Sequence, residues 1–131
     1  MASIFSKIIA GDIPCYKVAE NEEFFAFLDI HPVAQGHTLV IPKEEIDYIF
    51  DIEDEKLGRM MAFAKQIAAA QKKAIPCKRI GITVMGLEVP HAHIHLIPMS
   101  KEGDMRFPGG ELKLTADEFA EIAKNISSKL K

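Results

Sequence analysis

The chain has 131 residues, of which 48% are apolar and 27% charged, and its net charge is −3. This size and balance predict one soluble globular domain over residues 1–131, and no apolar run approaches the roughly 20 residues that a membrane span needs. Because the chain also lacks a signal-peptide pattern and an excess of positive charge, we expect a cytoplasmic protein that binds neither membranes nor nucleic acid.

The first half of the chain predicts a short helix followed by three strands. A helix over residues 3–10 stops at Gly11, and Asp12-Ile13-Pro14 then turns the chain. Apolar and aromatic runs bounded by turn residues predict strands over residues 16–20, 24–28 and 37–41. Cys15 and Cys77 form no Cys-x-x-Cys pair, so we expect two reduced, buried thiols.

The second half predicts a long central helix and two further strands. The helix over residues 54–73 ends before Pro76, and we expect its apolar face to consist of Leu57, Met61, Ala64, Ile67, Ala68 and Ile75. Strands are predicted over residues 79–85 and 91–98, as antiparallel neighbours joined by a short connection.

A final helix follows a glycine-rich loop. Thr115 and Glu118 have the spacing of a capping box, and the helix runs from there to about Lys129. The chain thus predicts five strands, a central helix and two terminal helices. Because short turns join the strands, we expect an α+β fold with one five-stranded antiparallel sheet.

Three of the five histidines stand at alternate positions in the segment His91-Ala92-His93-Ile94-His95. In a regular strand, side chains two positions apart share a face, so the imidazoles would line one side of the sheet at roughly 7 Å intervals. Ala92, Ile94 and Leu96 would then be buried on the other side. Imidazole acts as a nucleophile, a general acid or base, or a metal ligand, so we expect the active site here.

The triplet leaves several interpretations open. Each histidine taken alone fits a structural role. As a group, they favour His93 as a nucleophile toward phosphorus, because its two neighbours can orient it and donate hydrogen bonds to an anion. The rival is a zinc site. A regular strand would place the outer two side chains about 13 Å apart, too far for one ion, although two of them with His37 would suffice.

The His-x-His-x-His motif and the two apolar residues after it resemble the histidine triad (HIT) family of nucleotide-binding hydrolases and transferases. Residues 4–14, 26–30 and 36–43 are similar to segments of its HINT-like purine nucleoside phosphoramidase branch, in the same order. The resemblance covers residues 3–99 as the nucleotide-binding and catalytic region, and residues 100–131 form a C-terminal extension with a helix. It implies a HIT-like fold whose sheets join across a homodimer.

The resemblance also implies roles for individual residues. His93 matches the nucleophile that forms a nucleotidyl-histidine intermediate, and His95 matches the histidine that contacts the scissile phosphate. His91 matches the orienting histidine of the triad, which His37 supports from the neighbouring strand. Asp29 matches the carboxylate that accepts hydrogen bonds from the ribose hydroxyls. The other implied nucleotide-binding positions are Ile4, Phe5, Ile8, Ile13, Phe27, Ile30, Leu39, Glu88 and Val89.

Two of these assignments have structural alternatives. Asp29 precedes His31-Pro32 and is a common turn-forming residue in such a position. Each apolar residue of the set, taken singly, fits the core equally well, because apolar side chains are buried in any case.

The chain departs from the family pattern at two places. Just before the triad, where family members carry an Asn and a Gln that contact phosphate, the shorter segment 82–90 has no Asn and places Leu87 at the glutamine position. Ser3, Ser6 and Glu45 stand where many bacterial relatives have the Cys, Cys and His that bind structural zinc. We therefore expect no metal and no cofactor.

The sequence predicts a homodimeric hydrolase that binds purine nucleotides such as AMP and cleaves purine nucleoside 5′-phosphoramidates or related nucleoside monophosphate derivatives. A non-catalytic nucleotide-binding or interaction protein is the first alternative. A dinucleoside polyphosphate hydrolase is the second, although that branch relies on the missing glutamine. A metal-dependent hydrolase is the third.

Overall fold

The computed structural model describes residues 2–105 and 112–130. Its elements in chain order are α1 (Ile4–Ile9), β1 (Lys17–Glu20), β2 (Phe24–Leu28), β3 (Thr38–Pro42), η1 (Ile49–Asp51), α2 (Asp54–Ala74), β4 (Arg79–Thr83), β5 (Ile94–Met99), η2 (Glu102–Asp104) and α3 (Ala116–Ser128). The predicted helices and strands are all present, and most of the glycine-rich loop before the last helix lies outside the described residues.

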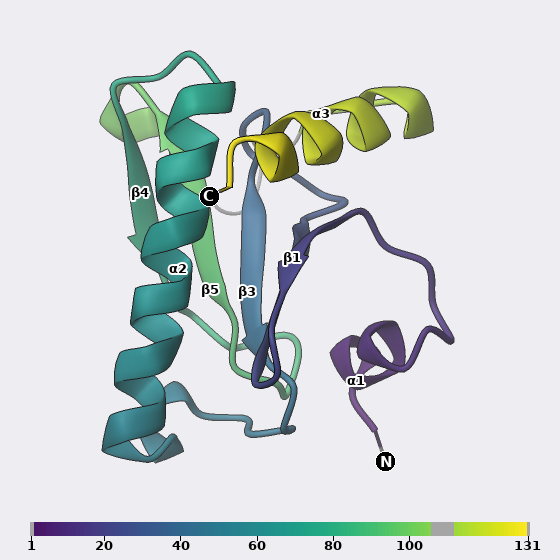
Figure 1. Cartoon of the computed structure of the whole chain (residues 1–131), viewed down its shortest axis with the longest axis vertical. Coiled ribbons are helices and arrows are strands. Elements are labelled where there is room, and N and C mark those ends of the chain that lie inside the picture. The colour runs from purple at the N-terminus through teal and green to yellow at the C-terminus, as the bar shows by residue number, and fades with distance from the viewer. Residues whose placement is uncertain (1, 106–111, 131) are drawn as a thin grey trace.

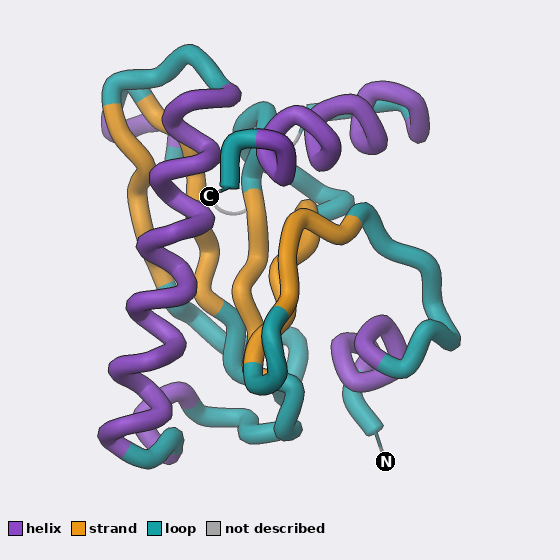
Figure 2. The backbone as a smooth tube through the Cα atoms, in the orientation of Figure 1, coloured by secondary structure: helices purple, strands orange, loops and turns teal. Residues whose placement is uncertain are grey.

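The five strands form one antiparallel sheet in the order β1-β2-β3-β5-β4, drawn in orange in Figure 2. This confirms the predicted α+β fold class. β5 lies between β3 and β4, so that His95 has Leu39 opposite it on one side and Thr83 on the other. A side chain at this position is held by two neighbouring strands, which fixes its direction more firmly than an edge strand would.

The alternation of side chains gives the sheet two different faces. The face covered by α2 holds the main core, to which the strands contribute Phe24, Ala26, Leu28, Val40, Ile94 and Leu96. Figure 1 shows α2 running along this face and α3 crossing its upper end. The opposite face carries a smaller cluster of Phe5, Phe25, Phe27, Leu39 and Ile41. Ala92, Ile94 and Leu96 are buried on the α2 side, as predicted.

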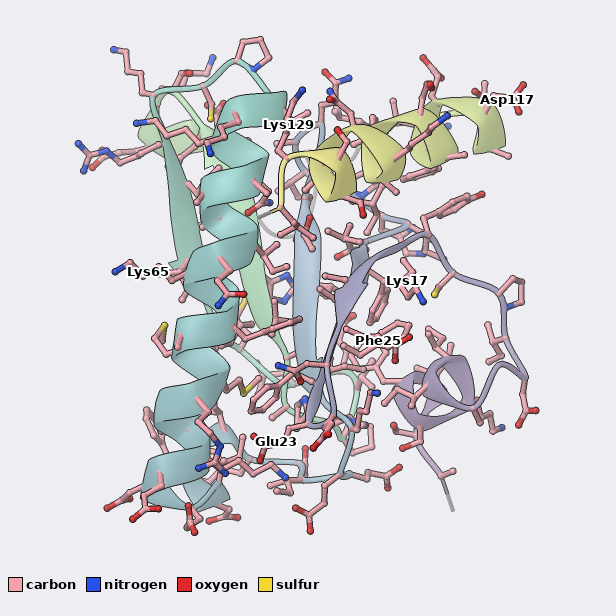
Figure 3. All side chains as sticks on the ribbon, in the orientation of Figure 1. Lys17, Glu23, Phe25, Lys65, Asp117 and Lys129 are labelled. Carbon is pink, nitrogen blue, oxygen red and sulfur yellow. The ribbon has the colours of Figure 1, made fainter. Side chains whose placement is uncertain are left out.

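α2 is the central helix, and its ends follow standard capping rules. The N-cap Glu53 accepts the N–H of Lys56, and acidic residues in the first turn and lysines in the last complement the helix dipole. Its buried face is Met60, Phe63, Ala64, Ile67, Ala70 and Gln71. The prediction that Met61 faces the core is wrong, since Met61 is 47% exposed. Lys65 projects away from the sheet (Figure 3).

Among the helices that the structure describes, none is both long enough and apolar enough to cross a bilayer.

α3 closes one end of the main core. It begins with the predicted capping box, in which the side chains of Thr115 and Glu118 each accept the other's backbone N–H. Phe119 stacks on Tyr16 with ring centroids 5.0 Å apart. The buried side of the helix consists of Phe119, Ile122, Ala123 and Ile126. The C-terminal extension is therefore an integral part of the domain.

Both cysteines are free, as expected, but neither is fully buried. Cys15 packs against the smaller cluster, and partial burial raises the pKa of its thiol. Because a raised pKa lowers the fraction of thiolate near neutral pH, Cys15 is a weak nucleophile.

We predict that Ile126→Ala lowers the free energy of unfolding by about 2–5 kcal/mol, because Ile126 is fully buried and its removal leaves a cavity. Urea denaturation followed by circular dichroism measures the change. Glu121→Ala, at an exposed position of α3, serves as the control and should change stability by less than about 0.5 kcal/mol. Equal, small effects of both substitutions would show that α3 does not belong to the core.

Candidate active site

Four of the five histidines gather on the sheet face opposite α2. His91 and His93 lie just before β5, His95 lies within it, and His37 directly precedes β3. All four side chains are buried in the protomer. The ring centroid of His95 lies 4.9 Å from that of His93 and 5.2 Å from that of His37. The structure thus brings together the four histidines predicted from sequence.

The expectation of a regular strand through the whole triplet is wrong. β5 begins at Ile94, so His91 and His93 lie in the non-repetitive segment before it. The rings of His93 and His95 are 4.9 Å apart rather than about 7 Å, and the ring of His91 faces Ser3 and Pro42. The strand-spacing argument against a shared metal ion therefore does not hold.

A backbone carbonyl places the proton of His93. Its Nδ1 lies 2.8 Å from the carbonyl oxygen of His91. Because a carbonyl only accepts hydrogen bonds, Nδ1 carries the proton and donates it. In the neutral ring, Nε2 then keeps its lone pair, as a nucleophile or a metal ligand requires. The ring of Phe5 packs against His93 edge to face, with centroids 5.0 Å apart, and restricts its rotation.

The same reasoning fixes the tautomer of His91. Its Nε2 lies 2.8 Å from the carbonyl oxygen of Pro42, so Nε2 donates. Its Nδ1 therefore accepts, and the hydroxyl of Ser3 lies 2.7 Å away as the donor. Both ring nitrogens of this fully buried side chain are thus satisfied.

A second hydrogen-bond chain runs through His37 and His95. The backbone N–H of Val33 donates to Nδ1 of His37 over 3.1 Å, so the proton of His37 lies on Nε2. His37 Nε2 donates in turn to Nδ1 of His95 over 2.9 Å. The proton of His95 therefore lies on Nε2. The backbone N–H of Val33 therefore sets the direction of both hydrogen bonds in this series.

Burial keeps the imidazoles of His37, His91 and His95 neutral near neutral pH. Burial, with a smaller contribution from His93, lowers the pKa of His37 to about 4. Burial and the neighbouring histidines lower the pKa of His95 to about 4, and burial also lowers the pKa of His91. Near neutral pH, the 3.5 Å contact between His37 Nε2 and Asp29 Oδ2 is therefore not an ion pair.

Asp29, His37 and His95 each place one possible ligand atom within 4.8 Å of the others. The hydrogen bonds disfavour a metal centre at this place. Since His37 accepts the Val33 N–H at Nδ1, metal binding at Nε2 would require the loss of its remaining proton. The 2.9 Å between the two facing ring nitrogens is also shorter than the roughly 3.3 Å between two tetrahedral ligands of zinc.

Asp29 has the turn-forming role considered from sequence. Its Oδ1 accepts the backbone N–H of His31 over 2.8 Å and so shapes the loop after β2. Its Oδ2 faces His37 at 3.5 Å, at the border of the histidine cluster. The carboxylate has two oxygens, and the turn uses only one of them.

The remaining residues that the resemblance assigns to nucleotide binding fall into two groups. Phe5, Phe27 and Leu39 belong to the smaller cluster, and Ile8 and Val89 pack against it. Ile4 and Ile30 are 50% and 59% exposed, Ile13 is half-buried and Glu88 is exposed. The first group forms apolar support on the histidine face, and the exposed members of the second are accessible to a ligand.

The segment before the triad presents no amide side chain. Leu87, at the position where the family has glutamine, is 91% exposed and makes little contact within the protomer. The nearby backbone is instead fixed by the bond from the His91 N–H to the carbonyl of Val89, at 2.8 Å.

Ser3 and Glu45 contact the site, although the sequence predicted no role for either of them in it. Ser3 donates to His91, and Glu45 Oε1 accepts both the Ser3 backbone N–H and the Ser6 hydroxyl over 2.6 Å. Their correspondence with the zinc-ligand positions of bacterial relatives was the available signal, because ligands of one ion must lie close together.

Comparisons with known proteins identify the family of the chain. A family model of the HIT domain matches residues 10–102. An uncharacterised HIT-like protein of Borreliella burgdorferi is 38% identical over 132 residues, covering 95% of each chain. The adenosine 5′-monophosphoramidase of Schizosaccharomyces pombe is 34% identical over the full length of both chains. A HIT-like protein of Bartonella henselae, described as involved in cell-cycle regulation, has a crystal structure that superposes with a TM-score of 0.85, at 32% identity and 98% and 96% coverage.

We predict that the free energy of unfolding falls as the pH drops from about 6.5 to about 4. Within this window the unfolded chain binds protons at His37 and His95, whereas the folded chain, with both pKa values near 4, does not. Acid therefore favours unfolding, and above pH 6.5 this contribution is constant. Urea midpoints at several pH values measure the slope.

His37→Asn should make this pH dependence shallower, whereas substitution of the exposed His31 by Gln should leave it unchanged. A slope in His37→Asn equal to that of the unsubstituted protein would contradict the assignment of a neutral, buried His37.

Proposed function

The chain belongs to the HIT domain family, and from this premise we propose that it hydrolyses purine nucleoside 5′-phosphoramidates, as a cytoplasmic homodimer. The observation that carries the proposal is that a ring nitrogen with a lone pair and a ring N–H donor belong to neighbouring histidines in a buried site. The lone pair of His93 lies on Nε2, and the neighbouring ring of His95 has its proton on Nε2. The activity named for the fission-yeast relative supports the choice of substrate class.

In the first step, Nε2 of His93 attacks the phosphorus of the substrate. The P–N bond breaks, and the amine leaves with the bonding electron pair and takes a proton from water. His93 becomes positively charged as the new N–P bond forms. The His91 carbonyl, already bonded to Nδ1–H of His93, stabilises that charge, because hydrogen bonds to charged groups are stronger.

In the second step, water attacks the phosphorus of the nucleotidyl-histidine and loses a proton to the solvent, which balances the proton that the amine took from water in the first step. The bond to Nε2 breaks, the electron pair returns to His93, and the nucleoside monophosphate is released. Two steps through a covalent intermediate replace one difficult displacement. Because imidazole regains its lone pair, the site is ready for another cycle.

In this proposal His95 is the donor to the phosphate oxygens. The chain from Val33 through His37 keeps its proton on Nε2, without rearrangement during the reaction. Such a preorganised donor stabilises the charge that develops on phosphate oxygens. Asp29 would accept hydrogen bonds from the ribose, and the apolar residues around Phe5 and Ile30 would hold the base.

A nucleotide-binding protein without turnover is the second candidate. The exposed Leu87 favours it, because this side chain supplies no hydrogen bond to phosphate at the position where the family has an amide. Binding by Asp29 and the apolar residues requires no such donor. A dinucleoside polyphosphate hydrolase, which depends on that glutamine in the family, is less compatible with this segment.

We propose that two chains pair along β4. Among the described residues, β4 pairs only with β5, which leaves the hydrogen-bonding groups of its other edge available. Ile82 in β4 and Val84 and Met85 just after it are 47%, 37% and 44% exposed. An apolar edge of this kind favours antiparallel pairing with the same strand of a second copy, which would join the two sheets about a twofold axis.

We predict that adenosine 5′-phosphoramidate is hydrolysed and that His93→Gly lowers kcat/KM by at least about 3 orders of magnitude, roughly 4 kcal/mol, because the nucleophile is lost. Steady-state release of AMP measures turnover, and calorimetry should show that the variant still binds AMP. His31→Gln, outside the cluster, is the control. The rate should be the same with and without a chelator, because no step uses a metal.

Three outcomes would contradict this proposal. Absence of turnover with intact AMP binding would favour the non-catalytic candidate. Loss of activity on chelation would favour a metal-dependent hydrolase. Faster cleavage of a diadenosine polyphosphate than of the phosphoramidate would favour the polyphosphate hydrolase.

We predict that Ile82→Glu converts the dimer into a monomer, because it would place two carboxylates in a closely packed twofold interface. Size-exclusion chromatography with light scattering measures the mass, and circular dichroism checks the fold. Leu112→Glu, which changes another partly exposed apolar side chain, should leave the dimer intact. A dimeric Ile82→Glu variant would exclude the β4 edge as the interface.

A further inference from the structure

A buried hydroxyl ties the start of α1 to the histidine cluster. Ser3 is only 6% exposed, and its Oγ lies 2.7 Å from Nδ1 of His91. The same oxygen accepts the backbone N–H of Ser6 over 3.0 Å, as the N-cap of the helix. Helix capping requires only the second of these bonds. The bond to His91 therefore needs another explanation.

The direction of the Ser3–His91 bond follows from its surroundings. His91 donates from Nε2 to the Pro42 carbonyl, so its Nδ1 is an acceptor. Two other acceptors lie near the Ser3 hydroxyl: Ser6 Oγ, which is farther away at 3.4 Å, and the Glu45 carboxylate, which already accepts the Ser3 backbone N–H and the Ser6 hydroxyl. The Ser3 hydroxyl thus donates to His91 and holds it in the tautomer with the proton on Nε2.

Glu45 also anchors Ser3. Its Oε1 accepts the backbone N–H of Ser3 and the hydroxyl of Ser6, both over 2.6 Å. These hydrogen bonds, the one from the Ser3 backbone above all, lower the pKa of the Glu45 carboxyl. Glu45 is therefore ionised near neutral pH and a strong acceptor.

His91 passes this constraint on to His93 through its main chain. The same residue whose ring is held by Ser3 and Pro42 provides the carbonyl that accepts the Nδ1–H of His93 over 2.8 Å. The two hydrogen bonds on the ring restrain the side chain and hence the Cα of His91, and the Ala92 N–H, which shares a peptide unit with this carbonyl, donates to the carbonyl of Ile46 over 2.7 Å. The carbonyl is therefore restrained from both ends.

We propose that Ser3, held by Glu45, is a positioning residue for the reaction. By fixing the tautomer and orientation of His91, it fixes the carbonyl that keeps the lone pair of His93 on Nε2. Ser3 acts through His91 and need not contact the substrate. This inference rests on the proposed function, in which His93 is the nucleophile.

The test compares Ser3→Gly with Ser3→Thr in the full chain. Glycine is nearly as good an N-cap as serine, so Ser3→Gly removes the hydroxyl at little cost to α1. We expect kcat for adenosine 5′-phosphoramidate to fall about 10-fold with KM unchanged, because only the transition state needs an exactly placed nucleophile. Ser3→Thr retains a hydroxyl and should stay within about 2-fold of the unsubstituted protein.

A second measurement does not depend on turnover. Long-range ¹H–¹⁵N correlation spectra of the histidine side chains distinguish the two neutral tautomers. His91 should show only the Nε2–H form in the unsubstituted protein and in Ser3→Thr, and a mixture of both forms in Ser3→Gly. Thr115→Gly is the matched control, because it changes the N-cap of α3 and should alter neither kcat nor the spectrum of His91.

The outcomes separate the inference from the proposed function. An unchanged tautomer of His91 in Ser3→Gly, an unchanged kcat, or an equal loss of kcat in Thr115→Gly would overturn the positioning role. If the unsubstituted protein showed no turnover but Ser3→Gly still changed the tautomer, the assigned geometry would stand and the proposed hydrolysis would fail.

Discussion

Three backbone groups determine where the protons of the histidine cluster lie. The carbonyls of Pro42 and His91 can only accept hydrogen bonds, and the N–H of Val33 can only donate. Because burial lowers the pKa of His37, His91 and His95, each of these rings has one proton to place near neutral pH, and the three backbone groups set where it lies in them and in the neutral form of His93. The chemistry depends on this constraint, since it leaves a lone pair on His93 beside a proton on His95.

The rest of the fold holds those backbone groups still. Gln71 of α2 is fully buried, and its Nε2 donates to the carbonyls of Gly36 and Leu96 over 2.9 and 3.0 Å. It therefore ties β5 to the residue just before His37, from the face opposite the histidines. A dense apolar core on the α2 face resists local shifts, so a bond on one face fixes geometry on the other.

In the proposed reaction, the N–H groups of the cluster would let a chain with a net charge of −3 accommodate an anionic phosphate. The site offers N–H dipoles instead of full positive charges, and donors fixed before the reaction need little reorganisation during it. The same burial makes the folded chain sensitive to acid, because His37 and His95 must remain uncharged, with only one proton each. The stability of the fold and the proposed reaction therefore both depend on His37 and His95 being neutral.

The sequence by itself determined the elements, their order and the set of histidines, because helix caps, turn residues and alternating apolar positions act over a few neighbouring residues. It could not choose between Met60 and Met61, since apolar residues at both positions allow two helix faces and only the sheet decides which is buried. Tertiary structure alone decided the start of β5 and the tautomers of His91 and His95. The groups that fix His91, namely Ser3 and Pro42, lie 88 and 49 positions away in the chain, and hydrogen bonds over such separations exist only after folding brings the partners together.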